Sequence, residues 1–175
     1  MKLFIGCGSS DKVDNTYFIG CRELLNILLK DNDLIFGSYD KGIMNIAYET
    51  AISNNRKVIG VLPKIYNCEL KMDEKIYVDN IEERTKKMID LCDAIVFLPG
   101  GLGTINEIFS AIDSKRCGEF NKPIVFYNYN HYYDKLFEFL DVLYSEKFSE
   151  IEDKKTYYVT DKIDELIKYL NEREG

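Results

Sequence analysis

Short apolar runs alternate with amphipathic stretches along the whole chain, and this alternation constrains the fold more than any other feature. The apolar runs are residues 3–6, 34–36, 58–62, 94–98, 123–127 and 157–159. Because they are continuously apolar, they predict strands that are buried on both faces. Helical spacing of apolar residues occurs at 17–30, 42–54, 81–92, 104–116, 132–144 and 161–171. Repeated strand–helix order predicts a parallel sheet with helices on both faces, that is, a single doubly wound α/β domain over residues 1–175.

This architecture indicates where a ligand should bind. Ligands of open α/β sheets lie beyond the carboxyl ends of the strands, near the point where the strand order reverses. The turns of interest are therefore residues 6–11, 37–42, 99–104 and the segment after residue 63. Residues 64–80 have no clear period, and we expect a long functional loop with some extended structure.

Composition narrows the class of ligand. The 175 residues carry a net charge of -7, which argues against a nucleic acid polymer as partner, although backbone amides can still bind a small anion. The five cysteines form no C-x-x-C pair and His131 is the single histidine, so the sequence predicts no metal site. No segment approaches the ~18 apolar residues that span a membrane. We therefore expect a cytoplasmic protein with unpaired thiols and no membrane contact.

A glycine-rich turn follows the apolar run 94–98. It reads Pro99-Gly100-Gly101-Leu102-Gly103-Thr104-Ile105-Asn106-Glu107 and leads into the helix predicted at 104–116. Glycine lets backbone N–H groups turn towards a ligand, and a helix N-terminus adds unpaired donors and the positive end of a dipole. Phosphate is the expected ligand. The alternative is a purely structural connection capped by Thr104.

Two charged residues are expected at the same edge. Glu107 falls in the first turn of the helix 104–116, where it either complements the helix dipole or directs a carboxylate at a sugar held over the turn. Arg84 lies near the start of the helix 81–92, whose N-terminus should also lie at the carboxyl edge of the sheet. Its planar guanidinium suits phosphate or the orientation of a carboxylate, although in its charged surroundings it could belong to a solvated face.

Other patterns are less informative. The turn 6–11 has Asp11 where a dinucleotide-binding G-x-G-x-x-G needs its third glycine, and Gly37 and Gly42 have P-loop spacing without the Lys and Ser or Thr that must follow. Cys7 as a nucleophile would need His131 as its base, and we expect His131 to be a surface or capping residue. The aromatic cluster 126–133 could stack a base, but a tyrosine-packed strand end is the simpler interpretation.

Taken together, these motifs resemble the Lonely Guy (LOG) family, the cytokinin riboside 5′-monophosphate phosphoribohydrolases, within a wider lysine-decarboxylase-like group. The P-G-G-x-G-T-x-x-E motif of that family is complete at 99–107, its Arg-x-x-x-Met element is matched by Arg84 and Met88, and its C-G-S-S by residues 7–10. The resemblance covers nearly the whole chain and implies a Rossmann-like fold. Nothing here resembles a pyridoxal-phosphate lysine site.

The resemblance also implies roles for individual residues. Glu107 and Arg84 would be the catalytic pair that releases a free base and ribose 5-phosphate from a nucleoside monophosphate. The residues implied to bind this substrate are Gly8, Ser9, Glu69, Gly100, Gly101, Gly103 and Thr104, with Glu69 the weakest match. No cofactor or metal is implied, and the assembly would be a homodimer with the pocket near its interface.

The sequence also departs from the family. Phe36-Gly37-Ser38 replaces a Gly-Gly-Gly, Thr85 and Asn106 replace a lysine and an acid, and residues 113–116 replace a Thr-Trp-x-Gln stretch that closes the base side of the pocket. AMP or a modified purine nucleotide is therefore as plausible a substrate as a cytokinin nucleotide. Two alternatives stay open, namely a nucleoside deoxyribosyltransferase-like enzyme and a non-catalytic carrier of a molybdopterin-type cofactor.

Overall fold

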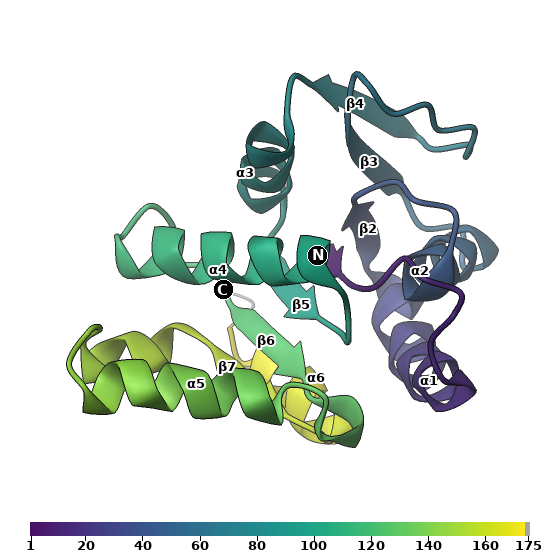
Figure 1. Cartoon of the computed structure of the whole chain (residues 1–175). Coiled ribbons are helices and arrows are strands. Elements are labelled where there is room, and N and C mark those ends of the chain that lie inside the picture. Colours follow the sequence, from purple (N-terminus) through teal and green to yellow (C-terminus); the bar gives the residue numbers. More distant parts are fainter. Residues whose placement is uncertain (174–175) are drawn as a thin grey trace.

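All seven strands of the computed structural model, which describes residues 1–173, run parallel in one sheet (Figure 1). The strand order is β4-β3-β2-β1-β5-β6-β7. The bounds are β1 Lys2–Gly6, β2 Asp33–Phe36, β3 Val58–Pro63, β4 Glu74–Val78, β5 Ala94–Phe97, β6 Ile124–Tyr127 and β7 Tyr158–Thr160. The six predicted strands are therefore confirmed, and so is the doubly wound α/β fold. That the chain is one domain from 1 to 175 stays a prediction.

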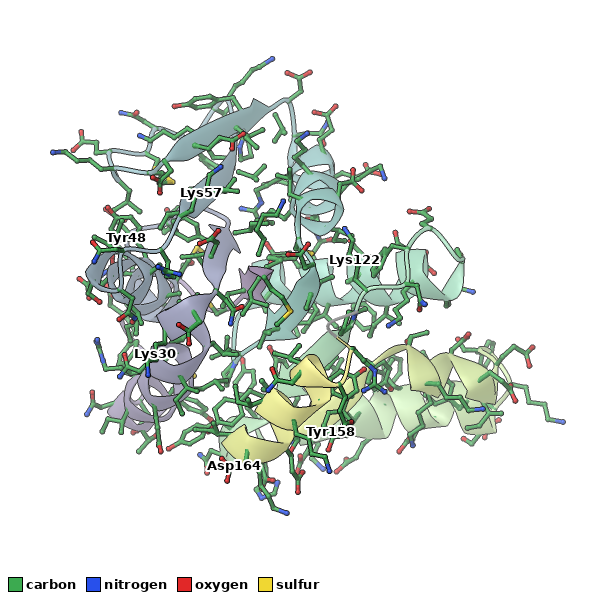
Figure 2. All side chains as sticks on the ribbon, turned by 180° about the vertical axis from the view of Figure 1, so that it is seen from behind. Lys30, Tyr48, Lys57, Lys122, Tyr158 and Asp164 are labelled. Carbon is green, nitrogen blue, oxygen red and sulfur yellow. The ribbon has the colours of Figure 1, made fainter. Side chains whose placement is uncertain are left out.

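In the part of the chain that the structure describes, six α-helices cover the two faces of the sheet. They are α1 Asn15–Asp31, α2 Gly42–Ser53, α3 Ile81–Leu91, α4 Leu102–Arg116, α5 Asp134–Ser145 and α6 Ile163–Asn171, with short 3₁₀ turns at η1 Tyr129–His131 and η2 Ile151–Thr156. Apolar side chains of α1, α2 and α6 pack on one face, and those of α3, α4 and α5 pack on the other. Figure 2 shows the molecule from behind, with Asp164 on α6 and Lys30 at the end of α1.

The strand order reverses at β1. The chain adds β2, β3 and β4 on one side of β1 and then returns to place β5 on its other side, so β1 pairs with both β2 and β5. The turns that leave β1 and β5 consequently lie next to each other, and the N–H of Gly8 donates to the carbonyl of Pro99 at 3.0 Å. This is the position at which open α/β sheets bind ligands.

The segment 64–80 is more regular than we expected. Residues 74–78 form β4, which pairs in parallel with β3 at the edge of the sheet, so the long loop is limited to residues 64–73. We expected some extended structure here but no defined strand, because β4 begins with the charged Glu74 and Lys75 and only Ile76 and Val78 pack on the core. Charge on an edge strand is common because it discourages pairing with another chain.

Within the described residues, no helix is both long enough and apolar enough to cross a membrane.

The predicted helix 132–144 begins two residues later, at Asp134. The turn η1 precedes it, and in that turn Asn130 and His131 have φ values of 53° and 57°.

Candidate active site

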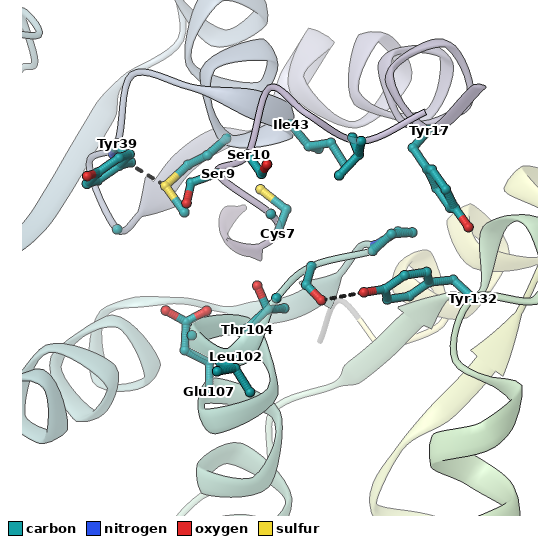
Figure 3. A pocket seen from close by; sticks show the side chains of 18 of the residues that line it. Cys7, Ser9, Ser10, Tyr17, Tyr39, Ile43, Leu102, Thr104, Glu107 and Tyr132 are labelled. Atoms are coloured by element: carbon teal, nitrogen blue, oxygen red, sulfur yellow. Dashed lines mark hydrogen bonds between the residues drawn. The ribbon is translucent and has the colours of Figure 1, made fainter. Parts of the chain in front are cut away.

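A cavity of about 440 Å³ opens at the carboxyl edge of the sheet (Figure 3). The turns after β1, β2 and β5 line it, together with the N-terminal ends of α2, α3 and α4. These are the turns that the strand order placed at the ligand edge. A cavity of this size matches the usual range for small-molecule sites, about 300–1,000 Å³.

Arg84 and Glu107 meet inside this cavity. Arg84 Nη2 donates to Glu107 Oε1 at 2.9 Å, and the two side chains are only 12% and 3% exposed. Burial raises the pKa of Glu107 to about 7, although the positive charge of Arg84 acts against this rise. The Nε of Arg84 is buried and has no hydrogen-bond partner among the described residues. The two charges are thus buried and close together, and one guanidinium donor is unsatisfied. These features favour a functional role over a solvated surface ion pair.

The helix dipole does not explain Glu107. The structure begins α4 at Leu102, two residues before the predicted start, so Glu107 lies beyond the first turn, which contains no acidic residue. The expectation that Glu107 occupies the first turn was therefore wrong, and with it the dipole-complement alternative. Burial of a carboxylate in the second turn is costly and needs another explanation. Glu107 lines the cavity, so a role in ligand binding or chemistry explains its position.

Two glycines make room for this pair. A Cβ on Gly6, at the end of β1, would lie 3.3 Å from Glu107 Oε2 and 2.5 Å from the ring of Phe97. A Cβ on Gly37, after β2, would lie 3.2 Å from Arg84 Nη1. Close approach of the backbone to functional side chains is a common reason for glycine at such positions. The P-loop spacing of Gly37 and Gly42 did not reveal this close approach of Gly37 to Arg84.

The glycine-rich turn is shaped by a different set of contacts. A Cβ on Gly100 would lie 2.2 Å from Thr104 Oγ1, so glycine there lets the buried Thr104 pack against the turn. The helix N-cap is Gly101 and no side chain caps it, so Thr104 is not the predicted cap. A Cβ on Gly101 or Gly103 would meet nothing within 4 Å. Both residues line the cavity, which leaves this part of the turn open to a ligand.

The loop after β1 forms the opposite wall. Gly8 and Ser9 line the cavity, as expected of them, together with Cys7 and Ser10. The carbonyl of Gly8 accepts from the N–H of Met44 at 3.1 Å, and Asp11 Oδ1 accepts from the N–H of Gly42 at 2.7 Å, so this loop rests on the start of α2. Gly42 has a φ of +62°, and a Cβ there would lie 2.7 Å from the N of Ser10. Only glycine satisfies both conditions without strain.

Aromatic side chains close the cavity at one end. Tyr17 from α1 and Tyr132 after η1 both line it, with ring centroids 5.6 Å apart, and they lie side by side in Figure 3. Tyr39 lies at the other end of the cavity in this view. Sequence reasoning named the aromatic cluster 126–133 but assigned it to packing. Tyr133 fits that interpretation because it is 1% exposed, whereas Tyr132 also faces the cavity.

A thiol nucleophile finds no support. Cys7 is 2% exposed, and burial together with the nearby Cys21 and Glu107 raises the pKa of its thiol. His131 does not line the cavity; its side chain is 70% exposed and its Nδ1 lies 3.4 Å from Asp134 Oδ2. His131 is thus the surface residue that we predicted. No group of three or more potential metal ligands occurs within residues 1–173.

Two expected parts of the pocket do not reach it. Glu69 is exposed in the 64–73 loop and does not line the cavity. The loop does reach the cavity at Tyr66, but its later part lies along β4, where Lys75 Nζ donates to the carbonyl of Cys68 at 2.8 Å. Its role in binding stays a prediction. Residues 113–116, expected at the base side, lie in the last turn of α4 outside the lining, where Asp113 and Arg116 pair at 2.5 Å.

Fold and site together define a class: a doubly wound α/β protein with a small-molecule pocket at the switch point of its sheet, built around a buried carboxylate–guanidinium pair and a glycine-rich turn. A family model described as "Possible lysine decarboxylase" matches residues 44–170, and the chain belongs to this family, the lysine-decarboxylase-like group that includes the LOG proteins.

Curated relatives agree with this assignment. The cytokinin riboside 5′-monophosphate phosphoribohydrolase LOG4 of Arabidopsis thaliana is 28% identical over 176 residues, which cover 98% of this chain and 82% of the relative. The probable cytokinin riboside 5′-monophosphate phosphoribohydrolase LOGL6 of Oryza sativa subsp. japonica is 30% identical over 152 residues, covering 84% of this chain and 61% of the relative.

Solved structures show the same fold. The molybdenum cofactor carrier protein of Chlamydomonas reinhardtii superposes with a TM-score of 0.70 at 18% identity, covering 98% of this chain and 96% of that one. The molybdenum cofactor binding protein of Rippkaea orientalis gives a TM-score of 0.72 at 17% identity, covering 98% and 95%. At these identities the likeness concerns the fold alone.

Proposed function

We propose that this protein hydrolyses the N-glycosidic bond of a nucleoside 5′-monophosphate, AMP or a modified purine nucleotide, to the free base and ribose 5-phosphate. The observation that carries the proposal is the buried Arg84–Glu107 pair, which lies in one cavity with the glycine-rich turn. A phosphate site and a carboxylate within the same small pocket are what cleavage of a phosphorylated sugar requires. The relatives named as phosphoribohydrolases support the same reaction class.

In this proposal the 5′-phosphate binds at the start of α4. Backbone N–H groups of Gly100, Gly101 and Gly103 would donate to its oxygens, Thr104 would add its hydroxyl, and the positive end of the helix dipole would favour the charge. Gly8 and Ser9 on the opposite wall would contact the nucleoside. The ribose would then lie between the two walls, close to Glu107.

The chemical step needs a negative charge beside the sugar. As the bond between the anomeric carbon and the base nitrogen breaks, positive charge develops on the ribose, and the carboxylate of Glu107 would stabilise it. A water molecule adds its hydroxyl to the anomeric carbon, and its remaining proton ends on the nitrogen of the departing base. Arg84 would orient Glu107 and hold its carboxylate in the ionised form. No metal or organic cofactor is needed for this step.

The identity of the base depends on the aromatic end of the cavity. Tyr17 and Tyr132 offer ring edges and faces against which a purine could pack, and Val13 and Ile43 add apolar surface. This surface suits AMP and also purines with an apolar substituent. Cytokinin nucleotides therefore belong in the test as candidates and not as the presumed substrate.

Two other functions compete with this proposal. A deoxyribosyltransferase-like enzyme would pass the sugar to a second base through a covalent intermediate on Glu107, and trapping that intermediate would favour it. A molybdopterin-type carrier would retain a phosphorylated ligand tightly without turnover. The carrier alternative is supported by the fold shared with the molybdenum cofactor carrier of Chlamydomonas reinhardtii.

The deciding experiment is incubation of the purified protein with a panel of nucleoside 5′-monophosphates and the matching nucleosides, with free base followed by chromatography. Glu107→Gln is assayed in parallel, with Glu119→Gln as the control because Glu119 is an exposed glutamate outside the cavity. We expect base release only from monophosphates, loss of turnover in Glu107→Gln with phosphate binding retained, and normal activity in Glu119→Gln. Normal kcat in Glu107→Gln, or no release from any member despite tight binding, would overturn the proposal.

We further propose a cytoplasmic homodimer. Leu102, at the cavity rim, is 89% exposed, and Phe109 on the same helix is 39% exposed, which is apolar surface that a second copy could cover. Light scattering coupled to size-exclusion chromatography tests the dimer, and Leu102→Glu should shift it towards monomer.

A further inference from the structure

Three consecutive carbonyl groups at the end of β5 and in the glycine-rich turn are each held by a donor from another part of the chain. Tyr133 Oη donates to the carbonyl of Leu98 at 2.6 Å, and Tyr132 Oη donates to that of Gly100 at 2.7 Å. Between them, the carbonyl of Pro99 accepts from the N–H of Gly8 at 3.0 Å. The hydrogen bond of Tyr132 is drawn in Figure 3.

Fixing a carbonyl also fixes the N–H of the residue that follows. A trans peptide group is planar, with its C=O and N–H pointing in opposite directions, and the described chain contains no cis peptide bond. The Gly8 contact therefore orients the N–H of Gly100, and the Tyr132 contact orients the N–H of Gly101. Glycine needs this restraint more than other residues because its backbone is otherwise free to rotate.

Tyr132 is itself held in place. Its ring packs edge-on against Tyr17 and Tyr133, with centroids 5.6 Å and 5.0 Å away. Asn128 fixes the neighbouring backbone, since its Oδ1 accepts from the N–H of Tyr133 at 2.7 Å and its Nδ2 donates to Asp134 Oδ1 at 2.7 Å. Although Tyr132 is 41% exposed, its ring packing and its hydroxyl hydrogen bond both restrict rotation of the side chain.

We propose that Tyr132 is a positioning residue of the anion site: its hydroxyl holds the Gly100–Gly101 peptide so that the N–H of Gly101 is preorganised to bind a phosphate group. The inference rests on the proposed placement of the 5′-phosphate at this turn. It gives the tyrosine a role in phosphate affinity that is separate from any contact with the base.

The test compares Tyr132→Phe, which removes only the hydroxyl, with Tyr129→Phe on the same segment. Tyr129 also packs against Tyr17, but it does not line the cavity and its hydroxyl makes no hydrogen bond within residues 1–173. Titration calorimetry measures the binding of inorganic phosphate to proteins that keep Glu107. Binding of AMP and adenosine is measured in the Glu107→Gln background, where we expect no turnover. Thermal unfolding of each variant reports whether its fold is intact.

We expect Tyr132→Phe to weaken binding of phosphate and AMP about five- to tenfold, the effect of one lost hydrogen bond, and to leave adenosine binding unchanged. In the turnover assay the same variant should raise KM with little change in kcat, and Tyr129→Phe should behave like wild type. Equal phosphate affinity in wild type and Tyr132→Phe, or an equal loss for AMP and adenosine, would overturn the inference.

These outcomes are separable from those of the proposed function. If the wild type binds phosphate and AMP but releases no base, the hydrolase proposal fails while the role of Tyr132 is still decided by the affinities. If the wild type binds neither phosphate nor AMP, both proposals fail.

Discussion

Arg84 gives Glu107 one hydrogen bond, from Nη2 to Oε1 at 2.9 Å, and its own buried Nε has no partner among residues 1–173. A buried donor without an acceptor costs about 1–3 kcal/mol, so the pair keeps an unsatisfied group next to the cavity. Arg84 is anchored on α3 and Glu107 on α4, so the pair also joins two helices on the same face of the sheet. A ligand oxygen that reached the guanidinium would recover part of this cost on binding.

Replacement of Arg84 should impair both rate and affinity. In Arg84→Ala, Glu107 loses the positive charge that opposes the rise of its pKa, so the carboxylate is less populated. We expect kcat/KM to fall by about 100-fold or more, with a smaller loss in Arg84→Lys, which keeps the charge but not the planar fork. Steady-state kinetics measures both. Lys86→Ala, on the exposed side of the same helix, is the control and should keep wild-type kinetics.

Activity should depend on pH through Glu107. Burial raises its pKa to about 7, and the proposed step uses the ionised form, so kcat/KM should increase as the pH rises through about 7. The phosphate of the substrate titrates near pH 6, and phosphorus NMR of the free nucleotide separates that transition. A profile that falls through the same range would mean that the protonated carboxyl is the active form.

Stability should depend on pH in the opposite sense. Between pH 4.5, the ordinary pKa of the carboxyl, and about 7, its value in the folded state, the folded protein binds more protons than the unfolded chain. The free energy of unfolding therefore decreases as pH rises through this window and levels off above it, a total change of about 3 kcal/mol. Urea unfolding at several pH values measures it. The difference between wild type and Glu107→Gln isolates this residue, and a difference that is independent of pH would contradict the assignment.

The open glycines of the turn should separate binding from stability. A methyl group at Gly103 meets nothing within 4 Å outside its own stretch of helix backbone, and alanine is the better helix former, so Gly103→Ala should keep or raise stability by up to about 1 kcal/mol. The same methyl group would occupy space beside the proposed phosphate, and we expect at least tenfold weaker binding of the monophosphate by calorimetry.

Gly118 is the converse control. It follows α4 with a φ of +79°, away from the cavity, so Gly118→Ala should destabilise the fold by about 1–2 kcal/mol and leave binding unchanged. Undiminished phosphate binding in Gly103→Ala would remove this part of the turn from the anion site.

Most of the fold could be predicted from the sequence because a strand that is buried on both faces appears as a continuous apolar run. Apart from Lys2 at the start of β1 and Asp33 at the start of β2, the five inner strands are apolar, whereas the edge strand β4 turns only Ile76 and Val78 to the core, on one face of the sheet. The edge strand β7 was recognised because the run 157–159 is apolar on both faces: Tyr157 and Val159 pack on one core and Tyr158 packs on the other. Burial of one face over five residues is a weak signal, and charged residues at its start made it weaker.

For the site, topology predicted what motifs alone could not. The order of strands and helices placed Arg84 and Glu107 at one edge, and the structure brings them into contact. The hydrogen bond from Tyr132 to Gly100 joins residues 32 positions apart, and no local pattern encodes it. Gly6 and Gly37 likewise owe their identity to side chains that come close only after folding. Contacts of this kind form only in the packed structure and produce no periodic pattern in the sequence.

The contact of Gly8 with Pro99 bears on how the protein acquires its pocket. It joins the turn after the first strand to the turn after the fifth, so β1 must pair with β5 before the two turns can meet. Contacts between distant parts of a chain form late because closing long loops is entropically slow. During refolding, recovery of ligand binding should therefore lag behind recovery of helical signal, and a nascent chain released before β5 would lack one wall of the pocket.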